Sequence, residues 1–322
     1  MPLVAWENES TAICDRIRST RGALKIVLKT KDDPFFLADW VAHHKQIVGG
    51  SNLIVFDNGS SDSKVLSAYQ ELGPDVLVAS FGGFHNNLHN PKNFEALYAS
   101  LSASSDFYCF LDTDEFLAFY DGERFASDAS ILRHLNDKEG GAFIPTTWLY
   151  NAPSYRDRML CGADLNTLRN GLTWGKPLIR SAAGPVSGEV NHNCQIAKGK
   201  KAPALLFGFF LLHMATLSPA QRVRANLNKL IARGFMERGE PLEKVLERDM
   251  SRATENEKLY VTEIKRMLTL REDPGSEQAP LQAGSMRIDQ SGKVEFASPN
   301  EERVFGEFAA SFDALCAETL PS

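Results

Sequence analysis

The chain has 322 residues, of which 43% are hydrophobic and 24% charged, and its formal net charge at pH 7 is -6. This length suits one large domain or two small ones. A negative whole-protein charge disfavours binding to nucleic acid or to an anionic membrane surface, so we expect no nucleic-acid partner. The five cysteines are an odd number without a C-x-x-C pair, which predicts free buried thiols rather than a disulfide framework or a zinc site.

The N-terminal segment MPLVAWENES has neither the basic stretch nor the apolar core of a secretory signal, which predicts a cytoplasmic protein. The longest apolar stretch, residues 204–212, is far shorter than the roughly 20 residues that span a bilayer. We therefore expect no transmembrane segment. A peripheral contact with a membrane and the oligomeric state stay open.

Strand and helix patterns alternate over about the first 120 residues. Apolar runs rich in β-branched residues predict strands, and the segments between them carry the apolar spacing of helices. The predicted strands cover residues 23–30, 52–62 with its terminal turn, 75–83 and 106–116, and the predicted helices cover 34–49, 63–73 and 93–103. This alternation predicts βαβ units, and therefore an α/β fold with a mostly parallel central sheet flanked by helices.

The pattern is less regular after the fourth strand. Residues 129–136 are predicted to be helical, 140–148, 176–181 and 204–212 to be strands, and 150–166 to be loop. From residue 218 to about 270 the chain is strongly helical with a break near 238–241, and a linker at 271–284, a hairpin at 286–297 and a terminal helix follow. We divide the chain into a first unit, residues 1–217, and a helical C-terminal region, residues 218–322, that packs on the same domain.

Polar side chains gather where the predicted strands end. Ligands of open α/β sheets bind outside the carboxyl ends of the strands, so residues far apart in the sequence are expected to share one crevice there. The residues at these ends are Asp32, Asp57, Asn58, Ser60, Asp112 and Asp114.

The segment CFLDTDEFLAF, residues 109–119, places carboxylates between two hydrophobic runs. On a strand, Asp112 and Asp114 point to the same side, and two carboxylates suit Mg²⁺ or Mn²⁺, which in turn would hold a diphosphate. The alternative is that these residues lie in a solvated loop or cap the next turn. If the two carboxylates only repel each other, removing one is expected to leave the fold intact.

The sequence from residue 28 to residue 62, LKTKDDPFFLADWVAHHKQIVGGSNLIVFDNGSSD, followed by FLDTDEFL, resembles the family 92 and family 2-like glycosyltransferases of the Rossmann-like GT-A fold. These enzymes carry a strand ending in K-N-E, a strand ending in DNxSxD and a DxDEF metal motif. This chain has Lys31-Asp32-Asp33 in place of K-N-E. The resemblance covers about the first 120 residues well and the remainder thinly.

The resemblance implies a metal-dependent, hexosyltransferase-like enzyme of polysaccharide biosynthesis. It would move a sugar from a nucleotide diphosphate sugar, a UDP-sugar, to a hydroxyl of a glycan or glycolipid with inversion. It implies Mn²⁺ or Mg²⁺ as cofactor, held by Asp112, Asp114 and His213. The implied nucleotide-sugar-binding residues are Lys29, Asp32, Asp57, Asn58, Asp62, Asp112, Lys176 and Arg180.

Several of these roles have alternatives. His213 opens HMATLSPAQRVRANLNKLIARG, similar to the family's HYxxKSxxEFxxKxxxG, with departures at Met214 and Leu217; it is otherwise a histidine with no ligand. Lys176 or Arg180 would neutralise the leaving diphosphate or be ordinary strand-edge charges. The cationic residues of the segment after His213 are assigned to a solvated helix face in preference to an anionic acceptor or membrane surface. They are Arg222, Arg224, Lys229 and Arg233.

An inverting transfer needs a carboxylate to take the acceptor proton, and Asp157, Asp164 and Glu189 are candidates among which the sequence does not choose. His85 and His89 lie in a predicted loop that could be near the nucleotide but carries no ligand pattern. His192 follows the strand with Lys176 and Arg180, and the related enzymes resemble this chain in carrying a histidine after such a strand. Two rival functions are considered. One is a nucleotide-sugar or glycan-binding protein without turnover, and the other, less favoured, is an aspartate-nucleophile phosphatase, which wants Thr or Val where Phe116 stands.

Overall fold

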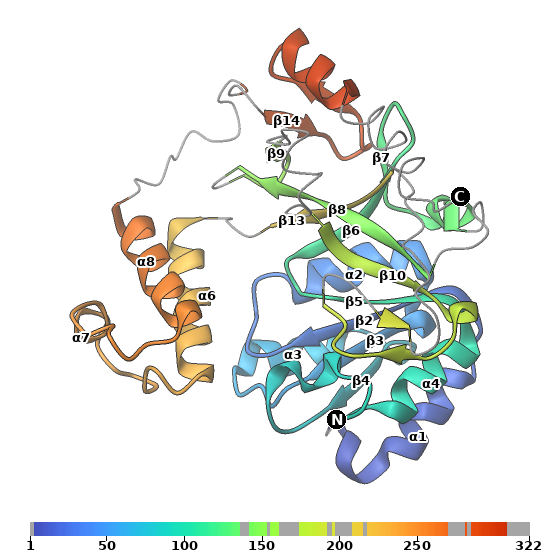
Figure 1. Cartoon of the computed structure of the whole chain (residues 1–322), viewed down its shortest axis with the longest axis horizontal. Helices are drawn as coiled ribbons and strands as arrows, with labels where there is room; N and C mark the ends of the chain where they lie inside the picture. Colours follow the sequence, from blue (N-terminus) through green and yellow to red (C-terminus); the bar gives the residue numbers. More distant parts are fainter. Residues whose placement is uncertain are drawn as a thin grey trace.

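The computed structural model of the chain describes residues 3–135, 142–152, 155–160, 174–191, 195–196, 208–214, 218–269, 281 and 285–307. One large twisted sheet runs through the molecule, and helices cover both of its faces (Figure 1). A separate helical unit lies beside it. No helix in the described ranges is long and apolar enough to cross a membrane.

The bounds of the elements are as follows. The strands are β1 (Val4–Ala5), β2 (Gly22–Thr30), β3 (Leu53–Asp57), β4 (Leu77–Ser80), β5 (Ser105–Leu111), β6 (Glu115–Tyr120), β7 (Phe125–Ala126), β8 (Phe143–Asn151), β9 (Arg158–Leu160), β10 (Trp174–Arg180), β11 (Val186–Ser187), β12 (Gln195–Ile196), β13 (Phe209–His213), β14 (Ser285–Ile288) and β15 (Val294–Phe296). The α-helices are α1 (Trp6–Arg18), α2 (Leu37–Val48), α3 (Ser63–Glu71), α4 (Glu95–Ser104), α6 (Pro219–Ala232), α7 (Leu242–Leu246) and α8 (Glu255–Thr269). Short 3₁₀ turns are η1 (Gly50–Asn52), η2 (His85–His89), η3 (Ala129–Leu135) and η4 (Ser181–Ala183).

The strand order of the sheet is β1-β4-β3-β2-β5-β10-β8-β13-β6-β7. The first five strands pair in parallel, as the βαβ pattern predicts. Beyond β5 the sheet is mixed, because β10 is antiparallel to both of its neighbours and β6 is antiparallel to β13. The α/β fold with a mostly parallel central sheet flanked by helices is therefore confirmed, and the antiparallel pairs belong to its second half.

The D-x-D motif lies between two strands that do not pair with each other. The segment 106–116, expected as a single strand, ends at Leu111 as β5, and a new strand, β6, begins at Glu115 on the far side of β10, β8 and β13. Asp112 and Asp114 therefore stand in the turn where the chain leaves one half of the sheet for the other. The strand period of two does not orient them.

Three further expectations differ in detail. Helix α2 begins at Leu37, so Pro34 precedes the helix instead of opening its first turn. Residues 129–135 form a 3₁₀ turn rather than an α-helix. The helix α1, which the sequence analysis did not identify, packs against α4 and β4.

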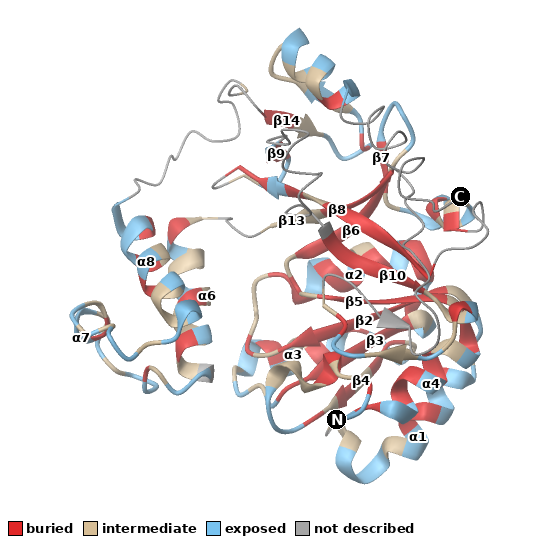
Figure 2. Ribbon diagram, in the orientation of Figure 1, coloured by how far each residue is buried: buried red, intermediate tan, exposed pale blue. Residues whose placement is uncertain are grey.

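The two sides of the sheet bury separate cores. Along β2, Leu24, Ile26 and Leu28 join the core that α2 covers, whereas Val27 joins the core beneath α1 and α4. This alternation is the strand period of two, read on both faces because both are covered. Figure 2 shows the buried strands at the centre, enclosed by helices whose outer faces are exposed. Cys14 and Cys109 are free and buried.

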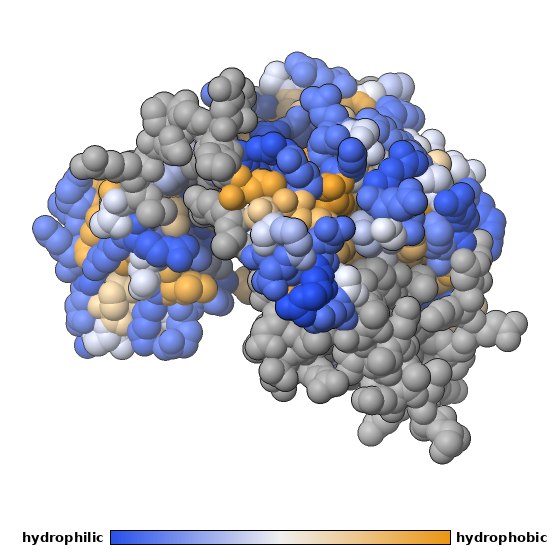
Figure 3. All heavy atoms as spheres, turned by 90° about the horizontal axis from the view of Figure 1, so that it is seen from above, coloured by the Kyte–Doolittle hydropathy of each residue, from blue (hydrophilic) through white to orange (hydrophobic). Residues whose placement is uncertain are grey.

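Helices α6, α7 and α8 form a compact unit with an apolar core of its own, including Leu230, Val245 and Ile264. Ser218 caps α6 by accepting a hydrogen bond from the Gln221 amide at 3.2 Å, and Pro219 follows at the first position. In the space-filling view the surface of this unit shows hydrophilic residues interspersed with hydrophobic ones (Figure 3). The predicted helical region with a break is confirmed for residues 219–269.

The predicted hairpin is formed by β14 and β15, and it joins the large sheet because β14 pairs with β9. Its turn contains Gly292 at φ 82°, where an added Cβ would lie 1.9 Å from the Phe125 carbonyl oxygen. The linker expected at 271–284 falls outside the described residues except for position 281.

Candidate functional site

At the carboxyl ends of the central strands, a carboxylate lies between two buried lysines. Asp112 Oδ2 lies 2.9 Å from Nζ of Lys176, and its Oδ1 lies 3.8 Å from Nζ of Lys29. The two lysine side chains are only 3% and 6% exposed, while the Asp112 side chain keeps 38% of its surface. Asp112 is therefore partly exposed beside two buried positive charges, and we call this region at the carboxyl ends of the strands the crevice.

This arrangement fixes the charge states. Burial acts to raise the pKa of Asp112, but Lys176 and Lys29 outweigh it and hold the pKa well below its usual range. Burial acts to lower the pKa of Lys176, but Asp112 and Glu115 outweigh it and the net pKa is raised. For Lys29 burial dominates, and its pKa is lowered despite Asp112. The positive charge that the D-x-D motif requires nearby thus comes from the chain itself.

Both lysines are also tied to loops of the crevice. Lys29 donates to Oδ1 of Asn86 in η2 at 3.0 Å, and Lys176 donates to Oδ1 of Asn191 at 2.8 Å. The Val190 amide donates to the His89 carbonyl at 2.8 Å, so these two loops meet. Lys29 and Lys176 therefore occupy fixed positions instead of extending into solvent.

The second aspartate of the motif faces the predicted histidine. Asp114 Oδ2 lies 3.3 Å from Nε2 of His213, because β13 pairs with β6 and aligns His213 with Glu115. Trp148 stacks on the His213 ring with centroids 5.2 Å apart. Burial acts to raise the pKa of Asp114, but His213 opposes it and the pKa falls to about 2. Burial acts to lower the pKa of His213, but Asp114 outweighs it and the pKa is raised.

Glu115 is a component that the sequence analysis missed. Its side chain is 1% exposed; Oε2 accepts from the Asp112 amide and Oε1 from Nε1 of Trp148, each at 2.9 Å. Burial raises its pKa to about 7, with Lys176 opposing and Asp112 adding to the shift. Glu115 therefore holds the D-x-D turn and orients Trp148, which stacks on His213. The signal was present in the sequence as the third carboxylate of DTDE.

A divalent metal ion fits only one side of this turn. Asp114 and His213 are an oxygen and a nitrogen ligand placed together, which suits Mn²⁺ or Mg²⁺ if phosphate oxygens complete the shell. Asp112 does not join them, since its oxygens face Lys29 and Lys176. Within the described residues no three His, Cys, Asp or Glu side chains are grouped so as to share a metal ion.

The residues predicted to bind the nucleotide from DNGSSD point inward. The Asp57 side chain accepts hydrogen bonds from the Ser60 amide at 2.8 Å, from the Ser60 hydroxyl and from the Tyr69 hydroxyl at 2.8 Å, and Asp57 is 1% exposed. Asn58 is 6% exposed and donates to the carbonyls of Phe81 and Gly83, each at 3.2 Å. Both side chains shape the loops beside the crevice, and the structure does not bring them to its surface.

Asp32 and Asp62 connect the sheet to the helical unit. Asp32 has a φ of 47°, and its Oδ1 accepts from the amides of Ser61 and Asp62 at 2.6 and 2.7 Å. Its Oδ2 lies 3.3 Å from Arg238, and Asn228 donates to its carbonyl at 3.1 Å. Asp62 caps α3 and lies 3.2 Å from Arg224. The helical unit is thus fastened at the carboxyl ends of β2 and β3.

Arg180 does not reach the crevice, which corrects one expectation. Strand β10 runs antiparallel to β5 and pairs Arg180 with Phe107, near the start of β5, whereas Asp112 follows the end of β5. Its guanidinium lies 5.0 Å from the centroid of the Phe107 ring. Lys176, four positions earlier on the same strand, is therefore the cation that the topology brings to Asp112.

The candidate catalytic bases lie in different parts of the structure. Asp157 lies 3.3 Å from Arg287 on β14 and is half exposed, so its charge is already paired. Glu189 is exposed beside the crevice, where its charge acts on Lys29. Asp164 and His192 lie outside the described residues.

The arginine-rich face of α6 is mostly paired. Arg222 contacts Glu263 at 2.8 Å, and Lys229 and Arg233 lie over the ring of Tyr260, 5.5 and 5.6 Å from its centroid. Lys229 also acts electrostatically on Asp114 and His85. One side of α6 therefore reaches the crevice instead of facing only solvent.

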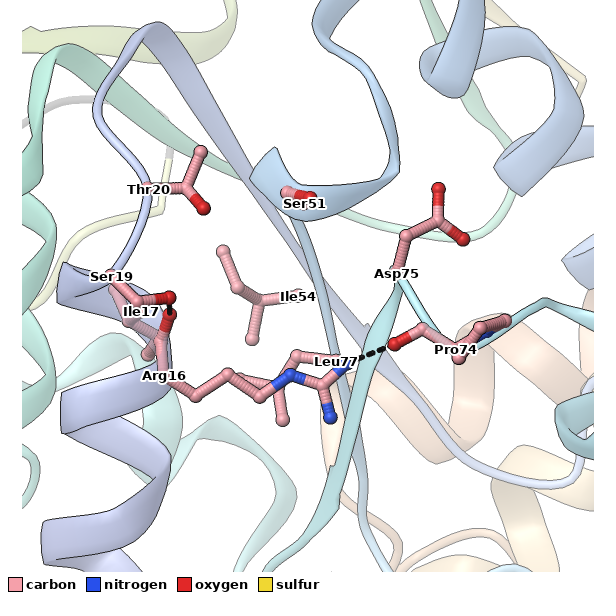
Figure 4. Close-up of a pocket in the computed structure, with 9 residues that line it drawn as sticks. All are labelled: Arg16, Ile17, Ser19, Thr20, Ser51, Ile54, Pro74, Asp75 and Leu77. Carbon is pink, nitrogen blue, oxygen red and sulfur yellow. Dashed lines mark hydrogen bonds between the residues drawn. The ribbon is translucent and has the colours of Figure 1, made fainter.

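A small cavity at the opposite ends of the parallel strands shows no comparable chemistry. Its volume is about 150 Å³, and its lining includes Arg16, Thr20, Ser51 and Asp75 (Figure 4). Arg16 points across it and donates to the Pro74 carbonyl at 2.6 Å. The neighbouring Lys25 is fully buried, bonded to the Thr20 carbonyl and Asn52, and burial lowers its pKa to about 8.

Comparisons with known proteins yield distant structural likenesses. No family model matches the chain, and no curated protein matches its sequence. Residues 1–349 of S. aureus TarS are similar at a TM-score of 0.34 and 12% identity, and the match covers 76% of this chain and 71% of that fragment. A mycobacterial protein is similar at a TM-score of 0.34 and 18% identity, and the match covers 70% of this chain and 79% of that protein's chain. A third similar structure is glucosyl-3-phosphoglycerate synthase from Mycobacterium tuberculosis, solved with Mg²⁺ and uridine diphosphate. Its TM-score is 0.26 and its identity 18%, and the match covers 43% of this chain and 47% of that chain. At such low TM-scores no role of this chain is taken from these structures.

Proposed function

We propose that this chain is a glycosyltransferase that moves a sugar from a nucleotide diphosphate sugar, a UDP-sugar, to a hydroxyl of a glycan or glycolipid acceptor. The observation that carries the proposal is the convergence of Lys29, Asp112, Asp114, Lys176 and His213 at the carboxyl end of the sheet. These residues come from three separate strands, β2, β10 and β13, and from the turn after β5. A crevice with fixed ammonium groups beside carboxylates suits an anionic ligand that also carries a metal ion.

In this proposal the diphosphate lies against Lys29 and Lys176. Both ammonium groups are already positioned by Asp112, Asn86 and Asn191, so little rearrangement is needed when charge develops on the leaving group. Mn²⁺ or Mg²⁺ would be held by Asp114 and His213, and Asp112 contributes through the lysines. Such an ion would act as a Lewis acid on the phosphate oxygens. Asp57, Asn58, Asp32 and Asp62 would act by shaping the loops that receive the nucleoside.

Glu189 is the proposed base. In an inverting transfer the acceptor oxygen attacks the anomeric carbon, its proton passes to a carboxylate, and the bond to the diphosphate breaks with its electron pair on the departing oxygen. Of the candidates, Glu189 lies near Lys29 and forms no ion pair within the described part of the chain, whereas Asp157 is paired with Arg287. Glu189→Gln should therefore reduce transfer while leaving donor affinity within a factor of about three.

A panel of nucleotide sugars, scored for Mn²⁺-dependent binding and for slow hydrolysis, tests the proposal. A transferase is expected to bind one donor tightly and to release its nucleoside diphosphate slowly in water. Binding with no release under any metal condition would instead support the rival function, a nucleotide-sugar-binding protein without turnover.

A further inference from the structure

Two histidines of the turn that contacts Lys29 are not yet used by the proposed function. Both belong to the turn η2, which follows β4, and the same turn supplies Asn86 to Lys29. His85 stacks near Phe81 and His89 meets Phe110 edge-on, with centroids 6.5 and 5.8 Å apart. Aromatic packing thus holds both rings in place beside Lys29.

The ring nitrogens of these histidines lack partners among the described residues. Neither Nδ1 nor Nε2 of His89 has a hydrogen-bond partner, although the residue is only 1% exposed, and Nδ1 of His85 is also buried and unpaired. A buried polar group without a partner is costly and calls for a ligand or another explanation. His43 and His44, by contrast, bond to the backbone of Leu117, and His44 also to Trp40.

The charges around the two histidine rings favour an anionic ligand. The largest charges acting on the two rings are those of Lys29, Lys31, Lys176 and Lys229, opposed by Asp112. These lysines come from β2, the loop after it, β10 and α6. The pKa of each histidine is lowered to about 3, mainly by burial and further by these lysines. The rings are therefore neutral near pH 7, and each carries one N–H donor.

We propose that His85 and His89 complete, with Lys29 and Lys176, a phosphate-binding pocket that holds a diphosphate without help from a metal ion. His85, the more accessible ring, would donate to a phosphate oxygen, and His89 would close the pocket behind it. Neutral N–H donors and fixed ammonium groups together match a phosphate, which offers acceptor oxygens and negative charge. The inference deepens the proposed function, since the phosphates would be those of the donor, but it requires no sugar transfer.

Inorganic pyrophosphate is the probe, titrated by calorimetry into the full chain with EDTA present. The parent is expected to bind it, and His85→Phe should weaken the affinity by about tenfold or more, because a donor next to a charged acceptor is lost. His85→Gln, which keeps an N–H group, should remain within about threefold of the parent. His89→Phe should weaken binding as well, and His134→Phe, on the distant η3, should not.

Histidine ring signals provide a readout that needs no variant. In the NMR spectrum of the parent chain, pyrophosphate with EDTA should shift the ring signals of His85 and His89 and leave those of His44 unchanged. Absence of pyrophosphate binding in EDTA, equal affinity in His85→Phe and the parent, or unshifted His85 signals would each overturn the inference. Pyrophosphate binding without hydrolysis of any nucleotide sugar would leave the pocket standing and refute the proposed transferase.

Discussion

Asp112 and Lys176 form an ion pair with a carboxylate-to-ammonium distance of 2.9 Å at the carboxyl ends of the central strands. The lysine is nearly fully buried, and Lys29 approaches the other carboxylate oxygen at 3.8 Å. The first aspartate of the D-x-D motif therefore holds two cations of the chain. This pairing separates the roles of the two aspartates, because only Asp114 faces His213.

Asp112→Asn is expected to destabilise the fold, contrary to the expectation that a repelled carboxylate contributes little. The change leaves Lys176 and Lys29 buried without a counter-charge, and because Asp112 is partly exposed we expect a loss of about 1–3 kcal/mol. Urea unfolding measures it. Asp75→Asn is the matched control: its side chain is also 38% exposed, but its partner Lys45 is 42% exposed. Equal losses in the two variants would show that the buried lysines do not depend on Asp112.

Lys176→Met should weaken nucleoside diphosphate binding by roughly tenfold to a hundredfold, because a desolvated charge-assisted contact is lost. Calorimetry with the free diphosphate measures this, and Lys45→Met serves as a surface control. The double variant Asp112→Asn with Lys176→Met should regain stability relative to Asp112→Asn alone while still binding poorly. Recovery of binding in the double variant would remove Lys176 from the diphosphate site.

His213→Ala should raise the Mn²⁺ concentration that half-saturates donor binding by about tenfold, the usual effect of losing one ligand or its support. Asp114→Asn should do the same, since both side chains would hold the ion. His134→Ala is the control for loss of an imidazole elsewhere. If His213→Ala keeps the parent's metal dependence, His213 serves only to pack against Trp148 and Tyr150.

Asp57→Asn should lower the free energy of unfolding by about 1–3 kcal/mol, because the carboxylate accepts from Ser60 and Tyr69 in a buried position. Nucleotide affinity should fall with it, since the turn 58–62 loses its anchor. Thermal and urea unfolding measure the first effect. Asp62→Asn is the control, because Asn also caps helices well. A stable Asp57→Asn variant with weakened nucleotide binding would instead indicate a direct contact.

Lys25 predicts a pH dependence of stability. Burial lowers its pKa to about 8 in the folded chain from the usual value of 10.5, so the unfolded chain binds more protons between these values and stability rises with pH there. The free energy of unfolding of the parent, minus that of Lys25→Met, should grow by about 2 kcal/mol from pH 7.5 to pH 10. A difference that stays flat would mean that Lys25 keeps its proton in the fold.

The sequence predicted the parallel half of the sheet and its ligand edge well, because those strands are apolar runs with β-branched residues and each is followed by a helical period. Asp112 and Asp114 were named from a strand end, and Lys29, Lys176 and His213 from the family resemblance; the structure brings these five residues together. The prediction that Arg180 binds the diphosphate was wrong for a topological reason. The direction of β10 relative to β5 is antiparallel, and no local pattern carries that information.

Other parts of the site depend on contacts between distant segments. Glu115, Trp148 and Asn191 contribute only once β6, β8 and the loop after β11 lie beside the D-x-D turn. Asp57 looked like a ligand residue because it ends a strand, but its hydrogen bonds to Ser60 and Tyr69 take up its oxygens. The η2 histidines were expected in a loop that could be near the nucleotide, but their spacing in HNNLH by itself favours no ligand.

The release of nucleoside diphosphate from the best-bound nucleotide sugar, measured with Mn²⁺ in the parent, Asp114→Asn and Lys176→Met, tests the account most directly. We predict slow release by the parent that both variants lose by at least about tenfold, since one change removes a metal ligand and the other a diphosphate contact. His134→Ala should match the parent. No release by the parent with any donor, or equal release by the parent and both variants, would contradict a glycosyl-transfer site at the D-x-D turn.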